Sequence, residues 1–341
     1  MKYLDYLQLN LDLTTVQNNG YSVIDLFAGC GGLALGFEAS GFETIGYEML
    51  KDACQSYSKN LNGKCHCTTL QIGLDLADNA DVIIGGPPCQ PFSVIGDQRG
   101  PDDPRDGFPI FLDAVKRYQP KVALFENVRG LLYRNRFYFE DIISKLANLK
   151  YNVEWKILNA VQYGVPQKRE RLFVVAHRGE WSFPRPVNEK KSITAGEALG
   201  ELAYAITPDS KFLTPSMDRY IAAYEKKSCC IRPRDLHLNA PSRTVTCRNL
   251  NGATSDMLRI RLPDGRRRRL TVREAARLQS FPDWFVFCGN EGSQFNQIGN
   301  AVPPLLSKAL ADSVLKCLES SEKENNEGKK QKFSRQERLN V

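Results

Sequence analysis

An α/β fold built on a doubly wound, mostly parallel sheet is the fold class that the sequence predicts. Three observations predict it: short apolar runs alternate with helix-like stretches, the first run ends in a cluster of glycines, and about six such runs have passed by residue 177. This alternation is typical of Rossmann-like folds, in which helices join parallel strands. The chain has 341 residues, 42% of them hydrophobic, which is enough to bury a core without disulfide bonds.

The expected strands are short, apolar and bounded by turn residues. They are residues 23–27, 42–48, 81–86, 122–126, 153–158 and 172–176. Helix-like stretches separate several of them, at residues 33–39, 111–118 and 139–149. Residues 1–20 are polar and mixed, which indicates a peripheral arm or a short helix.

The regular alternation weakens after residue 177. Residues 180–290 are rich in Pro, basic residues, Ser and Thr without a clear period, so we expect a small, irregular, β-rich domain there. Within it, the four consecutive arginines at 266–269 fit either a phosphate-binding run or a solvated turn.

The C-terminal part returns to helical patterns and then loses them. Helices are expected at residues 271–278 and 305–318. From residue 319 the chain consists mainly of Glu, Lys, Asn and Gln with little to bury, which predicts a disordered charged tail over residues 319–341.

Composition argues against several classes of protein. The formal net charge is +7, from 46 Lys and Arg against 39 Asp and Glu, which permits a polyanionic partner without requiring one. Ten cysteines without an N-terminal leader pattern are expected to be reduced thiols. The sequence has no CxxC pair and only three histidines, so we expect no metal site. No apolar run reaches about 18 residues, so no membrane span is expected.

The first chemical motif is the stretch Asp-Leu-Phe-Ala-Gly-Cys-Gly-Gly at residues 25–32. A strand that ends in glycines and feeds a helix brings bare backbone close to a bound ligand. Glu48 ends the next expected strand, 16 residues after Gly32 (48 − 32), where an acidic side chain accepts hydrogen bonds from ribose hydroxyls. The plainer interpretation of Glu48 is a solvent-exposed side chain. Together the two features indicate an adenosine cofactor and leave NAD and S-adenosylmethionine both open.

The second chemical motif surrounds Cys89, which follows Gly85-Gly86-Pro87-Pro88 and precedes Gln90-Pro91-Phe92-Ser93. Cys89 lies at the carboxyl end of an expected strand, the edge at which open α/β sheets place their chemistry. A single cysteine is most often an inert small hydrophobe. Here the flanking prolines and glutamine predict a turn rather than core packing, which favours a nucleophilic cysteine.

From these residues onward the sequence resembles the DNA cytosine-5 methyltransferase family, of the bacterial restriction–modification type. The similar motifs follow one another in the family's order and span about residues 21–315. They are Asp25 to Gly32, Pro87-Pro88-Cys89, Glu126-Asn127-Val128, Gln167-Lys168-Arg169-Glu170-Arg171, Arg273-Glu274-Ala275-Ala276-Arg277-Leu278-Gln279 and Gln297-Ile298-Gly299-Asn300-Ala301-Val302-Pro303-Pro304. Six short motifs in a fixed order make a chance match negligible.

The resemblance implies methyl transfer from S-adenosylmethionine to carbon 5 of cytosine in double-stranded DNA. A thiolate at Cys89 would add to carbon 6 and make carbon 5 nucleophilic. Glu126 would relieve the charge at N3, and Asn127 would brace its loop. The family implies that Arg171 contacts the base oxygen and the nucleophile region while Arg169 supports it, and a cation beside the thiol favours the thiolate. The plainer interpretation of the two arginines is that they bind phosphates.

The resemblance also implies the cofactor contacts. They are Phe27, Ala28, Gly29, Gly31, Leu33, Glu48, Asp75, Pro88, Asn300 and Val302. The family's Gly-Asp-Ile element, whose Asp binds the adenine amino group, has no clear match in this chain. Asp75 stands only 14 residues before Cys89 (89 − 75), and Thr68 and Thr69 stand nearer the expected place.

Cytosine in a duplex is stacked, so the target base must be flipped out of the helix. Residues 90–107 are rich in Gly, Pro, Asp and Arg, which is typical of a mobile lid after a nucleophile. We expect Ser93 and Arg99 of this lid near phosphates. We expect Gln90 or Ile95 near the vacated base position. The side chains most able to reach base edges or phosphates from the variable region are Arg232, Arg234, Arg243, Arg248 and Asn249.

The implied organisation has three parts. Residues 1–179 and 291–318 form the catalytic domain, residues 180–290 the target-recognition domain, and residues 319–341 the tail. The expected partner is double-stranded DNA, and the expected state is a monomer in the bacterial cytoplasm, associated with the nucleoid. The sequence leaves open whether a cognate restriction endonuclease accompanies the chain or the methylase is solitary.

Three other functions fit parts of the sequence. A cytosine-5 tRNA methyltransferase of the same family is one, but that branch carries Thr where this chain has Ser93, and a Cys-Phe-Thr element that this chain lacks. A catalytically inactive relative is disfavoured because Cys89, Glu126 and Arg171 are all present. A nicotinamide dehydrogenase would explain the glycine turn and not the Pro-Pro-Cys-Gln sequence.

Overall fold

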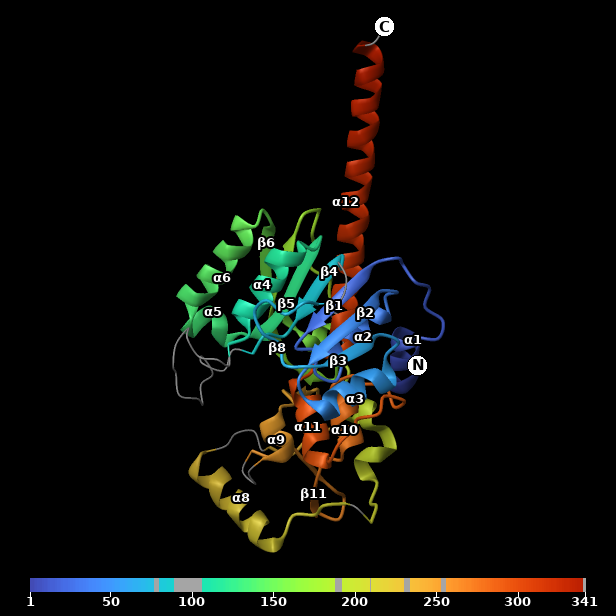
Figure 1. The fold of residues 1–341 in the computed structure, drawn as a ribbon. Coiled ribbons are helices and arrows are strands. Elements are labelled where there is room, and N and C mark those ends of the chain that lie inside the picture. The colour runs from blue at the N-terminus through green and yellow to red at the C-terminus, as the bar shows by residue number, and fades with distance from the viewer. Residues whose placement is uncertain are drawn as a thin grey trace.

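The computed structural model describes residues 1–76, 80–88, 106–187, 192–208, 210–229, 234–252 and 256–339, and for 323–339 only the course of the backbone. Its upper part in Figure 1 is a twisted sheet with helices on both faces, and its lower part holds the segment between the last sheet strand and the C-terminal helices. Among the described residues no helix combines the length and the apolar character that crossing a bilayer requires.

The sheet has seven strands in the order β3-β2-β1-β4-β5-β8-β6. The strands are β1 (Ser22–Leu26), β2 (Glu43–Glu48), β3 (Lys64–Cys67), β4 (Val82–Gly85), β5 (Val122–Val128), β6 (Asn152–Asn159) and β8 (Glu170–His177). Strands β3, β2, β1, β4 and β5 pair in parallel, whereas β8 is antiparallel to both β5 and β6. The predicted doubly wound, mostly parallel sheet is therefore confirmed. The four residues of β3 were not among the predicted strands, because a polar edge strand lacks the apolar run that identifies its neighbours.

Two apolar layers cover the two faces of the sheet. Helices α2 (Gly32–Glu38), α3 (Lys51–Asn60) and α12 (Pro304–Leu339) pack on one face, together with α1 (Tyr3–Leu11). Helices α4 (Phe108–Tyr118) and α6 (Arg136–Asn148) pack on the other (Figure 1). Successive strand residues alternate between the layers, since Val82 and Ile84 face the first and Ile83 faces the second.

The last helix, α12, packs closely against α2, which lies near the beginning of the chain. A Cβ atom on Gly36 of α2 would stand 2.3 Å from the backbone nitrogen of Lys308 in α12, so only glycine permits this close approach. Ser307 of α12 also donates a hydrogen bond to the carbonyl of Leu33. The helix continues to Leu339, through the segment for which the sequence predicts disorder. Glu, Lys and Gln are good helix formers, so a segment with little to bury can still extend an existing helix.

The region between the sheet and α12 is less rich in β-structure than predicted. Its strands are β9 (Ser242–Arg243), β10 (Arg259–Arg261) and β11 (Arg267–Arg269), and its α-helices are α7 (Ala195–Leu199), α8 (Pro215–Lys227), α9 (Cys247–Asn251), α10 (Val272–Leu278) and α11 (Glu291–Asn300). The longest of these elements is α8, with 13 residues. Its N-terminus carries two helix signals that the prediction of irregular structure overlooked: a Thr214 hydroxyl that accepts a hydrogen bond from Met217, and Pro215 in the first turn.

The four arginines at 266–269 differ in their surroundings: Arg266 is exposed beside the turn, whereas Arg267–Arg269 form strand β11. Arg268 is buried, and its two terminal nitrogens bond both oxygens of the buried Glu274 at 2.9 and 2.7 Å. Arg267 of β11 pairs with Asp218 and Asp235. In the facing strand β10, the fully buried Arg259 pairs with Glu225 and the same Asp235. These arginines hold the segment between β8 and α11 together from inside, which composition alone did not show.

Candidate active site

Two side chains from neighbouring strands form an ion pair at the carboxyl edge of the parallel strands. Glu126 lies near the end of β5, and Arg171 lies in β8 as the register partner of Val128. The Nε atom of Arg171 is 2.9 Å from Oε1 of Glu126, and the side chains are only 15% and 13% exposed. The structure thus brings together the two residues predicted to act on the ring of the target base.

The loop after β4 is held against this pair. The side chain of Asn127 donates a hydrogen bond to the carbonyl of Pro87 at 3.0 Å, a contact that fits the bracing role predicted for Asn127. A Cβ atom on Gly86 would lie 3.8 Å from Oε2 of Glu126. On the other side, the Gly107 amide donates to the carbonyl of Pro88 at 3.0 Å. Cys89 follows Pro88 directly in the chain and lies outside the described residues.

Arg169 is placed differently from Arg171. It is buried, with 1% of its surface exposed, and its terminal nitrogens donate to the carbonyls of Val245 at 2.8 Å and Gly299 at 3.3 Å. Burial, with a smaller contribution from the neighbouring Arg171, lowers the pKa of Arg169 to about 9. A guanidinium in this position joins the catalytic edge to the recognition region and to α11 (Glu291–Asn300). It fits the supporting role predicted for Arg169 and is not placed to reach a phosphate.

The glycine turn between β1 and α2 leaves backbone open on one side. Gly29 and Gly31 have φ of 57° and 89°, and Phe27 at the end of the strand has φ of 59°, which is unusual for an aromatic residue. A Cβ atom on Gly29 would meet nothing within 4 Å. A Cβ atom on Gly31 would stand 2.5 Å from Leu61, so a side chain there would clash. The turn is therefore open to a ligand at Gly29, whereas Gly31 is tightly packed against Leu61.

Glu48 ties this turn to the end of β2. One carboxylate oxygen accepts the Gly29 amide at 2.9 Å, and the other accepts the Leu50 amide at 2.8 Å. The residue is 8% exposed, so the plainer interpretation of a solvent-exposed side chain does not hold. Each oxygen keeps a lone pair that a ribose hydroxyl can use.

A buried carboxyl lies under the same turn and was not singled out from the sequence. Asp25 is 1% exposed, and its Oδ2 atom has no hydrogen-bond partner among the described residues. Burial, with a smaller contribution from Glu48, raises the pKa of Asp25 well above its ordinary value. The signal available in the sequence was an acidic residue inside an apolar strand, immediately before the glycine turn.

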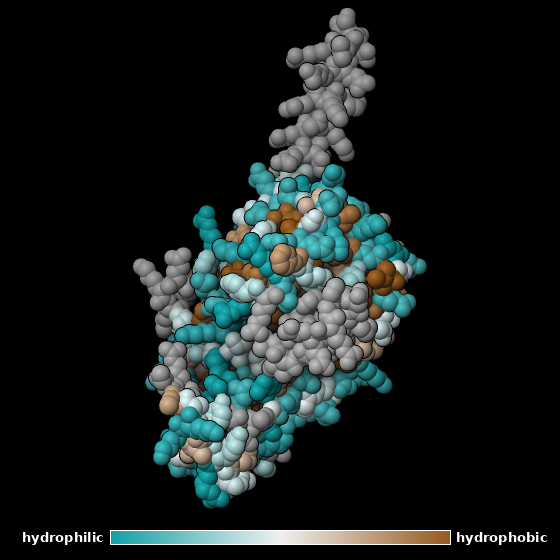
Figure 2. Space-filling view, turned by 90° about the vertical axis from the view of Figure 1, so that its left-hand side faces the viewer, coloured by the Kyte–Doolittle hydropathy of each residue, from teal (hydrophilic) through white to brown (hydrophobic). Residues whose placement is uncertain are grey.

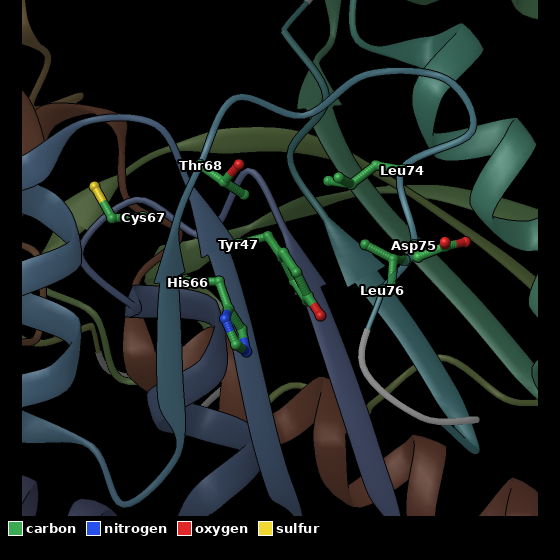
Figure 3. Close-up of a pocket in the computed structure, with 7 residues that line it drawn as sticks. All are labelled: Tyr47, His66, Cys67, Thr68, Leu74, Asp75 and Leu76. Atoms are coloured by element: carbon green, nitrogen blue, oxygen red, sulfur yellow. The ribbon is translucent and has the colours of Figure 1, made fainter.

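A cavity of about 470 Å³ lies beside the end of β2. Tyr47 and His66 stack in it with ring centroids 4.9 Å apart, and Thr68 lines it as well (Figure 3). Asp75 stands at its rim with its carboxylate turned away from these rings, 2.6 Å from Arg117 of α4. The prediction that Asp75 binds adenine does not fit this placement, because the carboxylate is 91% exposed and engaged by Arg117. Thr68, the alternative position, does reach the cavity.

The remaining predicted cofactor residues, apart from Asn300, lie around the turn. A Cβ atom on Gly107 would lie 2.4 Å from Pro88 and 2.9 Å from the Phe27 ring, so these two side chains meet at one spot. Ala28 and Leu33 are buried in the adjoining core. From the closing motif, the carbonyl of Val302 would stand 2.6 Å from a Cβ on Gly32. Asn300 accepts a contact from the thiol of Cys247 at 2.9 Å.

Three of the predicted DNA-binding arginines converge on one carboxylate. Asp256 lies 3.4 Å from Arg234, 3.2 Å from Arg243 and 3.5 Å from Arg248. Asn249 was predicted to contact DNA as well, but its placement in the structure does not favour this. It is 2% exposed, its Oδ1 accepts the Thr246 amide at 2.9 Å, and its Nδ2 donates to the carbonyl of Thr244 at 2.8 Å, so it caps α9. The predicted contacts Gln90, Ser93, Ile95, Arg99 and Arg232 lie outside the described residues.

Comparison with known families shows where this site belongs. The model of the family described as C-5 cytosine-specific DNA methylase matches residues 21–316, which is most of the chain. The chain belongs to this family. It is 61% identical over 320 residues to the type II methyltransferase M.AplI of Arthrospira platensis, covering 94% of this chain and 93% of that protein. It is 35% identical over 324 residues to the type II methyltransferase M1.HphI of Haemophilus parahaemolyticus, covering 86% of each chain.

A solved structure gives the same result for the fold. The methyltransferase EhMeth of Entamoeba histolytica superposes with a TM-score of 0.69 at 18% identity, covering 87% of this chain and 98% of that one. At this identity the likeness concerns the fold alone. The family and its type II relatives make this chain a DNA cytosine-5 methyltransferase of the restriction–modification type.

In this methyltransferase, further polar side chains connect the motifs, and sequence inspection alone did not single them out. Gln167 accepts the Val245 amide at 2.7 Å and donates to the carbonyl of Leu278 at 3.0 Å. Gln279 in turn donates to the carbonyls of Ile298 and Ala301. Both glutamines stand inside family motifs, yet only the fold shows that they bind one motif to the next.

Proposed function

We propose that this chain transfers a methyl group from S-adenosylmethionine to carbon 5 of a flipped-out cytosine in a specific double-stranded DNA sequence, through a covalent adduct between Cys89 and carbon 6. The observation that carries the proposal is the Glu126–Arg171 pair, 2.9 Å apart and held against the loop that leads into Cys89. With this arrangement, a base can lie between the nucleophile Cys89, the acid Glu126 and the cation Arg171.

The chain's own residues account for the steps at the base. The Cys89 thiolate adds to carbon 6, and the displaced electron pair moves toward N3, where Glu126 supplies a proton or hydrogen bond. Carbon 5 then takes the methyl group. Loss of the carbon 5 proton and release of the Cys89 sulfur restore the aromatic ring. A water molecule is a sufficient acceptor for that proton.

Arg171 serves both reactants in this scheme. Its guanidinium pairs with Glu126 through Nε, and Nη1 donates to the carbonyl of Glu170 at 2.8 Å. The fork is therefore fixed by protein partners before a base arrives, which favours catalysis because little reorganisation remains. Arg169, anchored on Val245 and Gly299, keeps the segment carrying Arg171 in register with the recognition region.

The residues around the glycine turn fit S-adenosylmethionine. Gly29 is open to a ligand, Glu48 retains lone pairs for a ribose, and the cavity beside Tyr47 and Thr68 has room for an aromatic base. Phe27 and Pro88 lie between this cradle and the Glu126 edge. S-adenosylmethionine, when bound, supplies an electrophilic methyl group. We place the adenine in the cavity, next to Thr68 rather than Asp75.

Catalysis and target recognition are assigned to different parts of the chain. We assign residues 1–179 and 291–318 to catalysis and residues 180–290 to target recognition. We further propose that residues 90–107 close over the DNA when the base is flipped, with Ser93 and Arg99 toward phosphates and Gln90 or Ile95 toward the vacated position. A monomer acting in the bacterial cytoplasm, alone or with a cognate endonuclease, is sufficient for this reaction.

Trapping with 5-fluorocytosine tests the covalent step. Fluorine occupies the position of the proton that must leave, so the adduct between Cys89 and carbon 6 cannot resolve after methyl transfer. A duplex carrying this base in the target sequence, incubated with the protein and S-adenosylmethionine, is expected to give a complex that survives denaturation, with the DNA attached to the Cys89 peptide in mass spectrometry.

The controls separate the nucleophile from other thiols and DNA from RNA. Cys89→Ala should abolish both the complex and methyl transfer while retaining DNA binding. Cys229→Ala, which removes an exposed thiol, should change neither. Tritiated methyl transfer should label duplex DNA and leave tRNA unlabelled. Methylation by Cys89→Ala, or labelling of tRNA in place of DNA, would refute the proposal.

A further inference from the structure

The recognition region keeps an excess of positive charge at one place. Around Asp256, three guanidinium groups face a single carboxylate: Arg234 and Arg243 approach Oδ1, and Arg248 approaches Oδ2. Arg243 also donates to the backbone carbonyl of Asp256. Elsewhere in the region several arginines have an acidic partner of their own, as Arg268 has Glu274 and Arg266 has Asp264. The cluster therefore carries two positive charges more than its carboxylate neutralises.

The way the arginines approach Asp256 leaves their donor groups available. Arg234 and Arg248 each turn the Nε atom toward the carboxylate, so the two terminal nitrogens of each point elsewhere. Among the described residues, these terminal nitrogens have no hydrogen-bond partner. Two parallel N–H groups at the end of a guanidinium match O6 and N7 of guanine in the major groove, the commonest specific contact between protein and DNA.

The cluster is also tied to the catalytic edge. Arg243 is the register partner of Lys168 in the pairing of β7 (Gln167–Lys168) with β9, and Lys168 stands three residues before Arg171. The backbones of Arg243 and Arg171 are therefore no more than about 15 Å apart, which corresponds to roughly four base-pair steps of DNA. On the face shown in Figure 2 the lower part of the molecule is mainly hydrophilic, as a DNA-facing surface requires.

Building on the function proposed above, we propose that Asp256 is a positioning residue that holds Arg234 and Arg248 ready to read guanine in the major groove beside the target cytosine. Arg243 holds Asp256 in place. Arg243 is partly buried, and its terminal nitrogens donate hydrogen bonds to the carboxylate and the backbone carbonyl of Asp256. Burial lowers the pKa of Arg243, and the Asp256 carboxylate opposes this shift more strongly than Arg234 adds to it.

The experiment begins with the recognition sequence, which methylation sequencing of DNA from a host expressing the chain provides. Each guanine near the target is then replaced in turn by 7-deazaguanine, which lacks the N7 acceptor, and kcat/KM for methyl transfer is measured. For the parent protein, at least one replacement should lower kcat/KM about ten-fold or more. For Arg248→Gln or Arg234→Gln, the same replacement should have little further effect.

Asp256→Asn tests the positioning role. It should reduce discrimination between the cognate sequence and sequences changed at that guanine, while methylation at a saturating concentration of cognate DNA persists. Asp264→Asn is the matched control, because it removes an exposed carboxylate from Arg266 in a turn of the same region and should leave discrimination unchanged. Arg248 is 62% exposed, so Arg248→Gln should fold and keeps the test valid if Asp256→Asn does not.

Two outcomes overturn the proposal. If Arg234→Gln and Arg248→Gln weaken binding equally for all sequences and reduce the dependence of log Kd on log salt by about one each, the arginines bind phosphates. If neither the variants nor the 7-deazaguanine substrates change discrimination, the cluster is structural. Both outcomes leave DNA methylation intact, whereas a chain that methylates no cytosine in DNA would fail the function proposed above instead.

Discussion

Two groups of arginines in the recognition region use the same side chain for opposite purposes. Around β10 and β11, Arg259 and Arg268 are fully buried and each meets at least one carboxylate of its own. Around Asp256, three partly exposed arginines share one carboxylate. The first group is engaged by carboxylates inside the protein, and the second retains terminal nitrogens for a ligand.

The difference shows why a count of basic residues does not locate a DNA-binding surface. The run at 266–269 is the densest positive segment of the sequence, yet three of its four arginines pair with carboxylates. The scattered Arg234, Arg243 and Arg248 make the surplus only when the chain folds. The ratio of guanidinium groups to carboxylates at one place, not along the sequence, is the quantity that indicates a polyanion site.

The largest effect should come from breaking the buried pair Arg268–Glu274. Arg268→Met leaves the Glu274 carboxylate buried without its bidentate partner, and removing one member of a buried pair costs about 3–5 kcal/mol of unfolding free energy. Urea denaturation followed by circular dichroism measures it. The control is Arg266→Ala, whose exposed pair with Asp264 should contribute less than about 1 kcal/mol. Equal losses in the two variants would remove the distinction between buried and exposed arginines in this run.

Arg169 is also a buried arginine, and replacing it should lower the unfolding free energy by less than replacing Arg268. Arg169→Met removes hydrogen bonds to the carbonyls of Val245 and Gly299 and leaves both carbonyls short of a partner. A hydrogen bond to a charged group contributes about 1.5–3 kcal/mol, so unfolding free energy should fall by that order. Because Arg169 also positions the segment of Arg171, kcat should fall as well. The control is Arg129→Ala, which removes an exposed arginine paired with Glu170, the residue between Arg169 and Arg171. It should change neither stability nor kcat strongly.

Asp25 is a carboxylate without a cation, and its effect should depend on pH. Burial raises its pKa in the folded state above its ordinary value of 3.8, so its contribution to stability is fully present below pH 3.8 and is lost as pH rises through the folded pKa. Asp25→Asn cannot ionise, and it should therefore unfold at a higher temperature than the parent at pH 7, by a margin that shrinks toward pH 4. Differential scanning calorimetry across this range measures the margin.

Asp12 supplies a control of opposite sign for this pH dependence. Hydrogen bonds from Thr14 lower the pKa of Asp12, so its contribution is present above its unfolded pKa and is lost as pH falls. Asp12→Asn should be slightly less stable than the parent at pH 7 and equal to it in acid. A margin for Asp25→Asn that is constant with pH would show that the Asp25 carboxyl is not the titrating group.

The catalytic edge could be predicted from the sequence because its chemistry is concentrated in contiguous motifs. Glu126 and Asn127 are neighbours in one motif, and Arg171 stands in another short motif. In the fold, Arg171 pairs with Glu126, and Asn127 bonds the loop after β4. Strand β3, by contrast, has no apolar run, and Asp75 could not be placed because its pairing with Arg117 depends on how α4 packs. Local pattern identifies a residue's type of chemistry, and only packing decides which way its side chain points.

The recognition region was hardest to predict because its arginines are distinguished only by distant partners. Arg259 meets Glu225 and Asp235, which precede it by 34 and 24 residues, and Asn249 is occupied by its own helix cap. The capping pattern Thr246-x-x-Asn249 was readable in the sequence and would have removed Asn249 from the DNA-binding set. Asp256 had no such signal, because nothing in the sequence shows that three arginines meet there.

The smallest effect on stability should come from the Asp256 cluster itself. Arg248→Gln removes an exposed cation whose Nε lies 3.5 Å from the carboxylate and which repels two other arginines, so the lost attraction and the relieved repulsion oppose each other. Unfolding free energy should therefore stay within about 0.5 kcal/mol of the parent. The same urea titrations that resolve the Arg268→Met loss measure this near-zero value. A loss as large as that of Arg268→Met would mean that the Asp256 cluster holds the fold together as β11 does, and the surplus charge would then no longer mark a surface reserved for DNA.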